Sequence, residues 1–151
     1  MKNNNIKFIY FGTGFFGEKV LKNLLDKNIK PEYIITSPDR PIGRHQIITS
    51  GPIKNVALEN DIPFLQPERL KSEEFLNKFK TIIDTDTLCV VCDYGKILPK
   101  VLLDLKTVDF INIHPSLLPT FRGPAPLQNT IFALCFVFRK IDLPNQRVKN
   151  K

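Results

Sequence analysis

No stretch of the 151-residue chain approaches the roughly 20 consecutive apolar residues that a membrane-spanning helix requires. The opening MKNNNIKFIY also lacks the apolar core and cleavage site of a secretory signal. Cysteine and histidine are scarce, with three and two residues. Three cysteines do not suit a disulfide-stapled secreted scaffold, and two histidines are too few for a histidine-rich metal site. We therefore expect a cytoplasmic chain that binds neither a membrane nor a metal.

The composition is that of one folded domain, with 42% hydrophobic and 25% charged residues. The net charge of +7 is unevenly distributed. Residues 1–132 hold 17 Lys and Arg against 14 Asp and Glu, whereas residues 133–151 hold five against one. Composition alone favours a solvated, lysine-rich surface over a site for an anionic partner, and both readings stay open.

Strand-like and helix-like patterns alternate along the chain. The patterns predict strands at 6–11, 33–37, 63–65, 87–92 and 108–113, a loop at 38–52, and helices at 16–27, from Pro52, from Ser72, at 98–105 and from Pro126 to Phe132. This alternation predicts a doubly wound, mostly parallel α/β sheet. The tail after Phe132 begins with an apolar helical run and shows no further strand, so we expect the sheet to be C-terminally incomplete.

Gly12, Gly14 and Gly17 form a G-x-G-x-x-G motif between a predicted strand and a helix. In that context a helix N-terminus can hold a pyrophosphate. A nicotinamide dinucleotide site also needs an acidic residue at the tip of the second strand, and Asp39 instead falls in the loop beyond Pro38. A tight turn that packs the helix on the strand is the better interpretation, with dinucleotide binding as the alternative.

Cys89 and Cys92 form a C-x-x-C inside an apolar predicted strand. A spacing of three places two strand side chains on opposite faces. We therefore expect two buried, unreactive thiols rather than a redox pair or a shared metal site.

Asn112 and His114 stand two residues apart at the end of a predicted strand, so they share one face. Doubly wound sheets place their binding sites at such strand ends. An amide donor beside an imidazole suits acyl transfer, because the amide can stabilise an oxyanion and the imidazole can handle the proton of an attacking amine. Without further information, a structural role for the histidine is the better interpretation, with catalysis as the alternative.

Four stretches resemble the N-terminal catalytic domain of methionyl-tRNA formyltransferases, which belong with glycinamide ribonucleotide transformylase to the folate-dependent formyltransferases. They are F-G-T at 11–13, S-P-D-R-P-I-G-R at 37–44, D-Y-G-K-I-L-P at 93–99, and 112–128 with its S-L-L-P-x-x-R-G-x-x-P core. The last stretch is specific to the folate enzymes, and the P-D-R-P-x-G-R loop indicates the tRNA enzyme. In this family the first turn is not a dinucleotide site.

The resemblance implies a Rossmann-like formyltransferase fold and transfer of a formyl group from 10-formyltetrahydrofolate to the amino group of methionyl initiator tRNA. By similarity, Asn112 polarises the formyl oxygen and His114 assists proton movement. The forked, permanently charged side chains of Arg40 and Arg44 are expected to contact tRNA. The resemblance assigns the folate site to Tyr94, Gly95, Ile97, Leu98, Pro99, Ser116, Leu117, Leu118, Pro119 and Arg122.

After Phe132 the sequence departs from the family, which continues with another strand and an Asp that orients the imidazole. Asp142, the one acid in residues 133–151, does not match that motif. We expect a partial formyltransferase domain at 1–132 and a divergent basic tail at 133–151, with no counterpart of the family's C-terminal tRNA-binding domain. We also expect the protein to be a monomer and its formyl transfer to be impaired. Two alternatives stay open: formyl transfer to a sugar-nucleotide amine, and an inactive fragment or folate-binding module.

Overall fold

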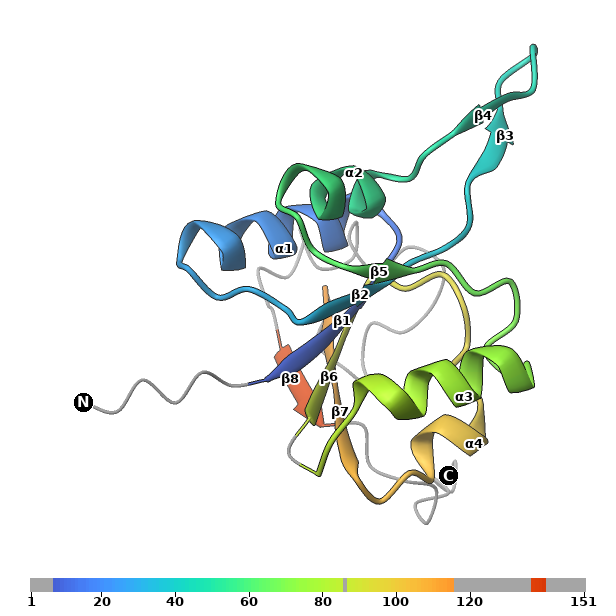
Figure 1. Cartoon of the computed structure of the whole chain (residues 1–151). Helices are drawn as coiled ribbons and strands as arrows, with labels where there is room; N and C mark the ends of the chain where they lie inside the picture. The colour runs from blue at the N-terminus through green and yellow to red at the C-terminus, as the bar shows by residue number, and fades with distance from the viewer. Residues whose placement is uncertain (1–6, 86, 116–136, 141–151) are drawn as a thin grey trace, which may run out of the picture.

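A single six-stranded sheet organises the computed structural model, which describes residues 7–85, 87–115 and 137–140 (Figure 1). Its strands are β1 (Phe8–Gly12), β2 (Tyr33–Ile35), β5 (Phe64–Leu65), β6 (Thr87–Cys92), β7 (Val108–His114) and β8 (Val137–Lys140). The spatial order is β5-β2-β1-β6-β7-β8. The first five strands in this order run parallel, and β8 pairs antiparallel with β7.

Helices cover both faces of the sheet (Figure 1). They are α1 (Phe15–Asp26), α2 (Pro52–Glu59), α3 (Glu73–Ile82) and α4 (Lys100–Leu103). Successive residues of β1 point to opposite faces: Tyr10 joins the core cluster of α1 and α2, whereas Phe11 joins the cluster of α3 and α4. The structure thus confirms the predicted doubly wound, mostly parallel α/β fold. No helix in the described ranges is long and apolar enough to cross a membrane.

Local sequence signals account for several element boundaries. Strand β6 has the predicted bounds and is almost wholly buried, as expected of a strand covered on both faces. Helix α2 begins with Pro52, whose missing N–H costs nothing in the first turn. Helix α3 is capped by Ser72, whose Oγ accepts a hydrogen bond from the Phe75 N–H at 3.4 Å. The predicted helix from Pro126 to Phe132 lies outside the described residues.

The predicted loop at 38–52 is wrong in part, because it contains a two-stranded antiparallel ribbon. Strands β3 (Arg40–Ile42) and β4 (Ile47–Thr49) pair through Pro41↔Ile48, and the turn between them uses Gly43 at φ +74°. Proline suggested a loop, but a ribbon with no third strand leaves one side of each strand unpaired and so tolerates proline. Figure 1 shows the ribbon extending away from the sheet.

The predicted absence of a strand after Phe132 is also wrong, and residues 137–140 of the expected helical run form a strand instead. Strand β8 covers the edge of β7 in the register Ile113↔Phe138 and His114↔Val137. An uncovered β7 would present a row of unpaired N–H and C=O groups, and a segment rich in valine and phenylalanine can satisfy them as a strand. The tail therefore contributes to the sheet.

Candidate functional site

A cavity of about 430 Å³ opens at the carboxyl ends of β6 and β7. This is the edge at which doubly wound sheets bind their ligands, and the volume lies within the range of small-molecule sites. Its described lining residues are Val91, Asp93, Tyr94, Gly95, Lys96, Leu98, Leu103, Asn112, Ile113, His114 and Pro115.

Asn112 and His114 both line this cavity, as the two-residue spacing predicts. Phe110 precedes them on the same face of β7 and is buried in the cluster of α3 and α4, while Ile111 and Ile113 pack against the opposite cluster. The backbone of β7 is paired on both sides, with β6 and with β8. The structure thus brings an amide and an imidazole together on a strand end whose direction is fixed from both sides.

The segment after β6 forms the second wall of the cavity. Tyr94, Gly95 and Leu98 line it as expected. Ile97 is instead 94% exposed, and Pro99 is buried as the N-cap of α4, so neither side chain belongs to the described lining. The remaining residues assigned to the folate site lie outside the described part of the chain: Ser116, Leu117, Leu118, Pro119 and Arg122.

Tyr94 anchors that wall in the core. Its ring meets the ring of Phe11 edge to face, with the centroids 5.5 Å apart. The Tyr94 hydroxyl is buried and has no hydrogen-bond partner among the described residues. Burial raises the pKa of Tyr94 above its ordinary value, so the hydroxyl keeps its proton.

Asp93 holds the same wall against the glycine-rich turn, a role that no local sequence pattern predicts. Its backbone carbonyl accepts hydrogen bonds from the N–H groups of Thr13 and Gly14, at 3.1 and 3.2 Å. Its carboxylate accepts from the first turn of α1, at 3.2 Å from Phe16 N and 3.4 Å from Gly17 N. The N-terminus of α1, where a pyrophosphate would bind, therefore already contacts an anion of the chain itself.

The glycines of the motif permit this close packing. A Cβ at Gly17 would lie 2.7 Å from the Cys92 carbonyl oxygen, and a Cβ at Gly14 would lie 2.1 Å from Asp93 Oδ2. The structure therefore confirms the interpretation of G-x-G-x-x-G as a turn that packs α1 on the sheet.

Lys96 ties the cavity wall to the segment that follows β5. Its Nζ donates hydrogen bonds to the carbonyl oxygens of Pro67 at 2.6 Å and Glu68 at 3.0 Å. Desolvation lowers the pKa of Lys96. No local sequence pattern predicts this contact, because the partners are backbone carbonyls 29 and 28 residues away.

Cys89 and Cys92 belong to the two different core clusters, which confirms their predicted placement on opposite faces of β6. Burial raises the pKa of Cys89 to about 12 and that of Cys92 to about 11. Within residues 7–85, 87–115 and 137–140, no three His, Cys, Asp or Glu side chains come together as metal ligands.

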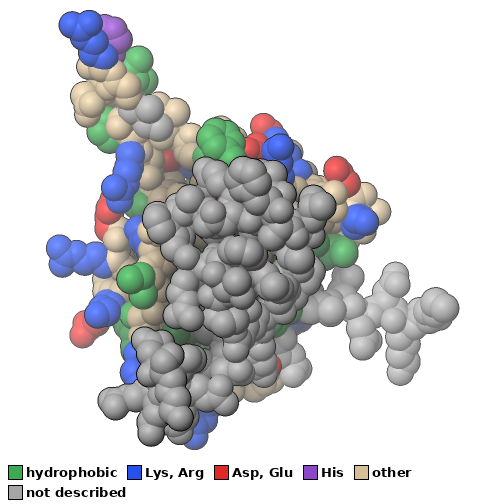
Figure 2. Space-filling model, turned by 180° about the vertical axis from the view of Figure 1, so that it is seen from behind, with side chains coloured by type: hydrophobic (Ala, Val, Ile, Leu, Met, Phe, Trp, Pro, Cys, Tyr) green, Lys and Arg blue, Asp and Glu red, His purple; other side chains and the backbone are tan. Residues whose placement is uncertain are grey.

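The ribbon of β3 and β4 presents both arginines expected to contact tRNA. Arg40 lies on β3 and Arg44 in the turn, and both are exposed. Figure 2 shows the projecting ribbon with basic side chains and a histidine at its end. Two apolar side chains, Ile47 and Ile48, are also exposed there, at 65% and 74%.

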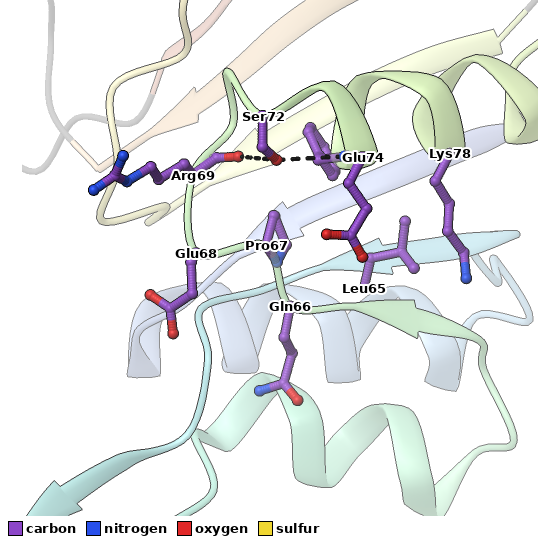
Figure 3. Close-up of a pocket in the computed structure, with 9 residues that line it drawn as sticks. Leu65, Gln66, Pro67, Glu68, Arg69, Ser72, Glu74 and Lys78 are labelled. Atoms are coloured by element: carbon purple, nitrogen blue, oxygen red, sulfur yellow. Dashed lines mark hydrogen bonds between the residues drawn. The ribbon is translucent and has the colours of Figure 1, made fainter.

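A second cavity, of about 390 Å³, lies between the end of β5 and the start of α3 (Figure 3). Its charged lining residues carry both signs, with Glu68 and Glu74 beside Arg69 and Lys78. Its described lining contains no histidine or cysteine. The cavity at β6 and β7 is the better candidate for chemistry, since it holds the amide and imidazole pair.

The known proteins that this chain resembles in sequence are formyltransferases. Residues 4–133 match the formyl transferase family. A methionyl-tRNA formyltransferase of Sulfurihydrogenibium sp. (strain YO3AOP1) is 41% identical over 127 residues, which are 83% of this chain and 40% of the relative. The methionyl-tRNA formyltransferase of Caldicellulosiruptor saccharolyticus is 42% identical over 127 residues, covering 82% of this chain and 40% of that protein. The chain thus spans about two fifths of the length of these curated relatives.

Among solved structures, the phosphoribosylglycinamide formyltransferase from Bacillus halodurans superposes with a TM-score of 0.62. The match covers 90% of this chain and 72% of that protein, at 16% sequence identity. At this identity the likeness supports the fold assignment alone.

Proposed function

This chain belongs to the formyl transferase family, and we propose that it transfers a formyl group from 10-formyltetrahydrofolate to the amino group of methionyl initiator tRNA. The observation that carries the proposal is the convergence of Asn112 and His114 on one cavity at the carboxyl edge of the sheet. We assign residues 1–132 to a partial formyltransferase domain and residues 133–151 to a divergent tail. We also propose that the protein is cytoplasmic and that it works as a monomer.

The two side chains divide the reaction between them. The amine of the acceptor attacks the formyl carbon, a C–N bond forms to the amine, and the bond from the formyl carbon to N10 of the donor breaks. The Asn112 amide donates a hydrogen bond to the formyl oxygen as negative charge develops on it. His114 takes the proton that the amine loses and delivers it to the leaving N10. Because the amine is the nucleophile, no covalent intermediate with the protein forms.

The cavity suits a folate-type donor in its physical character. Aliphatic side chains at Val91, Leu98 and Leu103 provide apolar contact, and the 93–95 turn supplies backbone groups. We propose that Tyr94, Gly95 and Leu98 bind the donor, together with the other residues that the family resemblance assigns: Ile97, Pro99, Ser116, Leu117, Leu118, Pro119 and Arg122.

The exposed ribbon supports a nucleic-acid acceptor over a small one. Arg40 and Arg44 are forked cations on a projecting element, which suits contact with a phosphate backbone. We propose that these two side chains contact the acceptor end of the tRNA while its amino group reaches the cavity.

An acceptor comparison tests the proposal. The chain is incubated with 10-formyltetrahydrofolate and either methionyl initiator tRNA or a sugar-nucleotide amine, and formylated product is measured. We expect formylation of the tRNA above that of an Asn112→Ala, His114→Ala double variant. Preferred formylation of the sugar nucleotide would replace the proposed acceptor.

Calorimetric titration with tetrahydrofolate accompanies the assay. Binding of tetrahydrofolate without formylation of either acceptor would show that the chain is a folate-binding module and not an enzyme. If the chain neither binds tetrahydrofolate nor formylates an acceptor, it is inactive.

A further inference from the structure

Asp39 lies at the base of the projecting ribbon, immediately before β3, and its carboxylate contacts the other leg of the ribbon and two segments of the body. One oxygen accepts hydrogen bonds from Lys54 Nζ of α2 and from Ser50 Oγ, the latter at 3.4 Å. The other oxygen accepts from Gln66 Nε2, just beyond β5, at 2.9 Å. Gln66 Nε2 also donates to the Ser37 carbonyl oxygen at 2.8 Å. Both legs of the ribbon are therefore tied to the body at one point, which we call the Asp39 clasp (Asp39, Ser50, Lys54 and Gln66).

The clasp is more sheltered than the other ion pairs of the described residues. Its Lys54 and Asp39 side chains are 18% and 25% exposed, whereas each of the other three pairs contains a lysine that is more than half exposed. Lys54 Nζ also lies 5.8 Å from the centre of the Phe64 ring, within cation–π range. The hydrogen bonds from Lys54 and Gln66 hold the pKa of Asp39 below its ordinary value, so the carboxylate is charged at neutral pH.

The ribbon beyond the clasp has no core of its own. Every side chain from 40 to 49 whose exposure is described lies in solvent. An isolated two-stranded ribbon is marginally stable and has nothing to fix its direction except its connections. The clasp supplies such a connection, because it holds the two legs at fixed points on α2 and on the segment after β5.

We propose that Asp39 is a positioning residue that fixes the direction of the β3–β4 ribbon and so presents Arg40 and Arg44 to an anionic acceptor. The acceptor part of this inference rests on the function proposed above, whereas the mechanical part stands on the hydrogen bonds alone. Asp39 touches neither substrate in this mechanism. It acts by lowering the ordering cost that the ribbon would otherwise bring to binding.

The mechanical part is tested by electron-spin distance measurement on the free protein. Nitroxide labels are placed at His45→Cys, in the ribbon turn, and at Lys78→Cys, on the exposed side of α3. The protein also carries Cys135→Ser, which removes the third cysteine and leaves only the buried Cys89 and Cys92. The distance distribution is compared with that of the same labelled protein carrying Asp39→Asn or Lys54→Met. Glu18→Gln is the matched control, because it breaks another lysine–carboxylate pair, on α1, that includes no residue of the ribbon or the clasp.

We expect a narrow distribution for the parent and for Glu18→Gln, and a broad one for both clasp variants. The Asp39→Asn, Lys54→Met double variant is expected to be no broader than either single variant, because the two residues act through one contact. Unchanged widths in both clasp variants would overturn the inference, whatever the enzymatic result. Urea unfolding of each variant separates a loose ribbon from a loosened fold.

Kinetics test the acceptor part. We expect Asp39→Asn to raise the KM for methionyl initiator tRNA about five- to tenfold with kcat within about twofold of wild type, since preorganisation affects binding more than chemistry. Asp39→Glu, which keeps the charge, should recover most of the affinity. An unchanged KM would overturn this part. If the wild-type chain formylates no tRNA, the proposed function fails, and the distance measurement still decides whether the clasp positions the ribbon.

Discussion

Asn112 and His114 owe their common direction to the geometry of a single strand. Side chains two residues apart lie on the same face of β7, and Phe110, two residues before Asn112, is buried on that face. Buried Phe110 therefore fixes the rotation of the strand and, with it, the face on which the next two alternate side chains emerge. At this scale the candidate chemistry follows directly from the sequence N-I-H after an apolar run.

Cysteine reactivity gives a prediction at the same scale. With pKa values of about 12 and about 11, Cys89 and Cys92 have roughly 0.1% or less thiolate at pH 8, against tens of per cent for an ordinary thiol. We expect the folded Cys135→Ser variant to react with a thiol-specific disulfide reagent at least about 100-fold more slowly than the same chain in denaturant. Rapid labelling of the folded protein would contradict the burial of these side chains.

The same shifts predict how stability depends on alkaline pH. The folded pKa lies above the unfolded one, so the folded state binds more protons between these two values. The contribution of the two protonated thiols to folding stability is complete below about pH 8.5 and is lost as the pH rises toward about 11. The urea concentration at the midpoint of unfolding should decrease as the pH is raised from 8 to 10.5. The decrease should be smaller in a Cys89→Ala, Cys92→Ala variant. An equal fall in the two proteins would contradict the prediction.

Other residues of the site could not be read from the sequence. Asp93 and Lys96 work through partners that are distant in the chain, such as Gly17 and Pro67, and no local pattern encodes such pairings. The exposure of Ile97 likewise depends on how the 93–99 segment turns after β6. The family resemblance marked the segment but not the direction of each side chain.

At the scale of the elements, helix α1 depends on a capping residue, Asp93, that lies directly after β6. Asp93 has φ +51°, a left-handed conformation, and its carboxylate accepts from Phe16 N and Gly17 N. Asp93→Ala loses the cap and adds left-handed strain, so we expect the free energy of unfolding to fall by about 2 kcal/mol. Asp93→Gly loses only the cap and should cost about 1 kcal/mol.

The control for this prediction is Asp26→Ala, at the opposite end of the same helix. An acid in the last turn faces the negative end of the helix dipole, so its removal should change the free energy of unfolding by less than about 0.5 kcal/mol. Urea unfolding measures all three variants. Equal losses for Asp93→Ala and Asp93→Gly would show that the backbone conformation carries no strain.

The elements differ in how far the sequence predicts them. Strand β6 and helix α3 follow from short-range signals, an apolar run in one and a Ser72 cap in the other. Strands β3 and β8 do not, because each exists through a partner: Pro41 pairs across a turn, and Val137 pairs with the distant His114. Pairing of this kind is set by the edges that the fold leaves open.

For the molecule as a whole, the alternation of strands and helices was enough to predict a doubly wound sheet, and the structure has a cavity at its carboxyl edge. The net charge was less informative, because much of the basic excess lies in residues 133–151. Arg40 and Arg44 lie on the projecting ribbon, and we propose that the Asp39 clasp fixes the direction of this ribbon.

Single-turnover formyl transfer is the most direct measurement of whether the cavity at β6 and β7 performs the chemistry. The rate is compared for the wild type, Asn112→Ala, His114→Ala and the double variant at saturating 10-formyltetrahydrofolate and methionyl initiator tRNA, with tetrahydrofolate affinity measured alongside. We predict a loss of at least about 100-fold in the double variant, with the Kd for tetrahydrofolate changed by less than about threefold. A double variant that transfers formyl groups at the wild-type rate would contradict the assignment of the reaction to these two side chains.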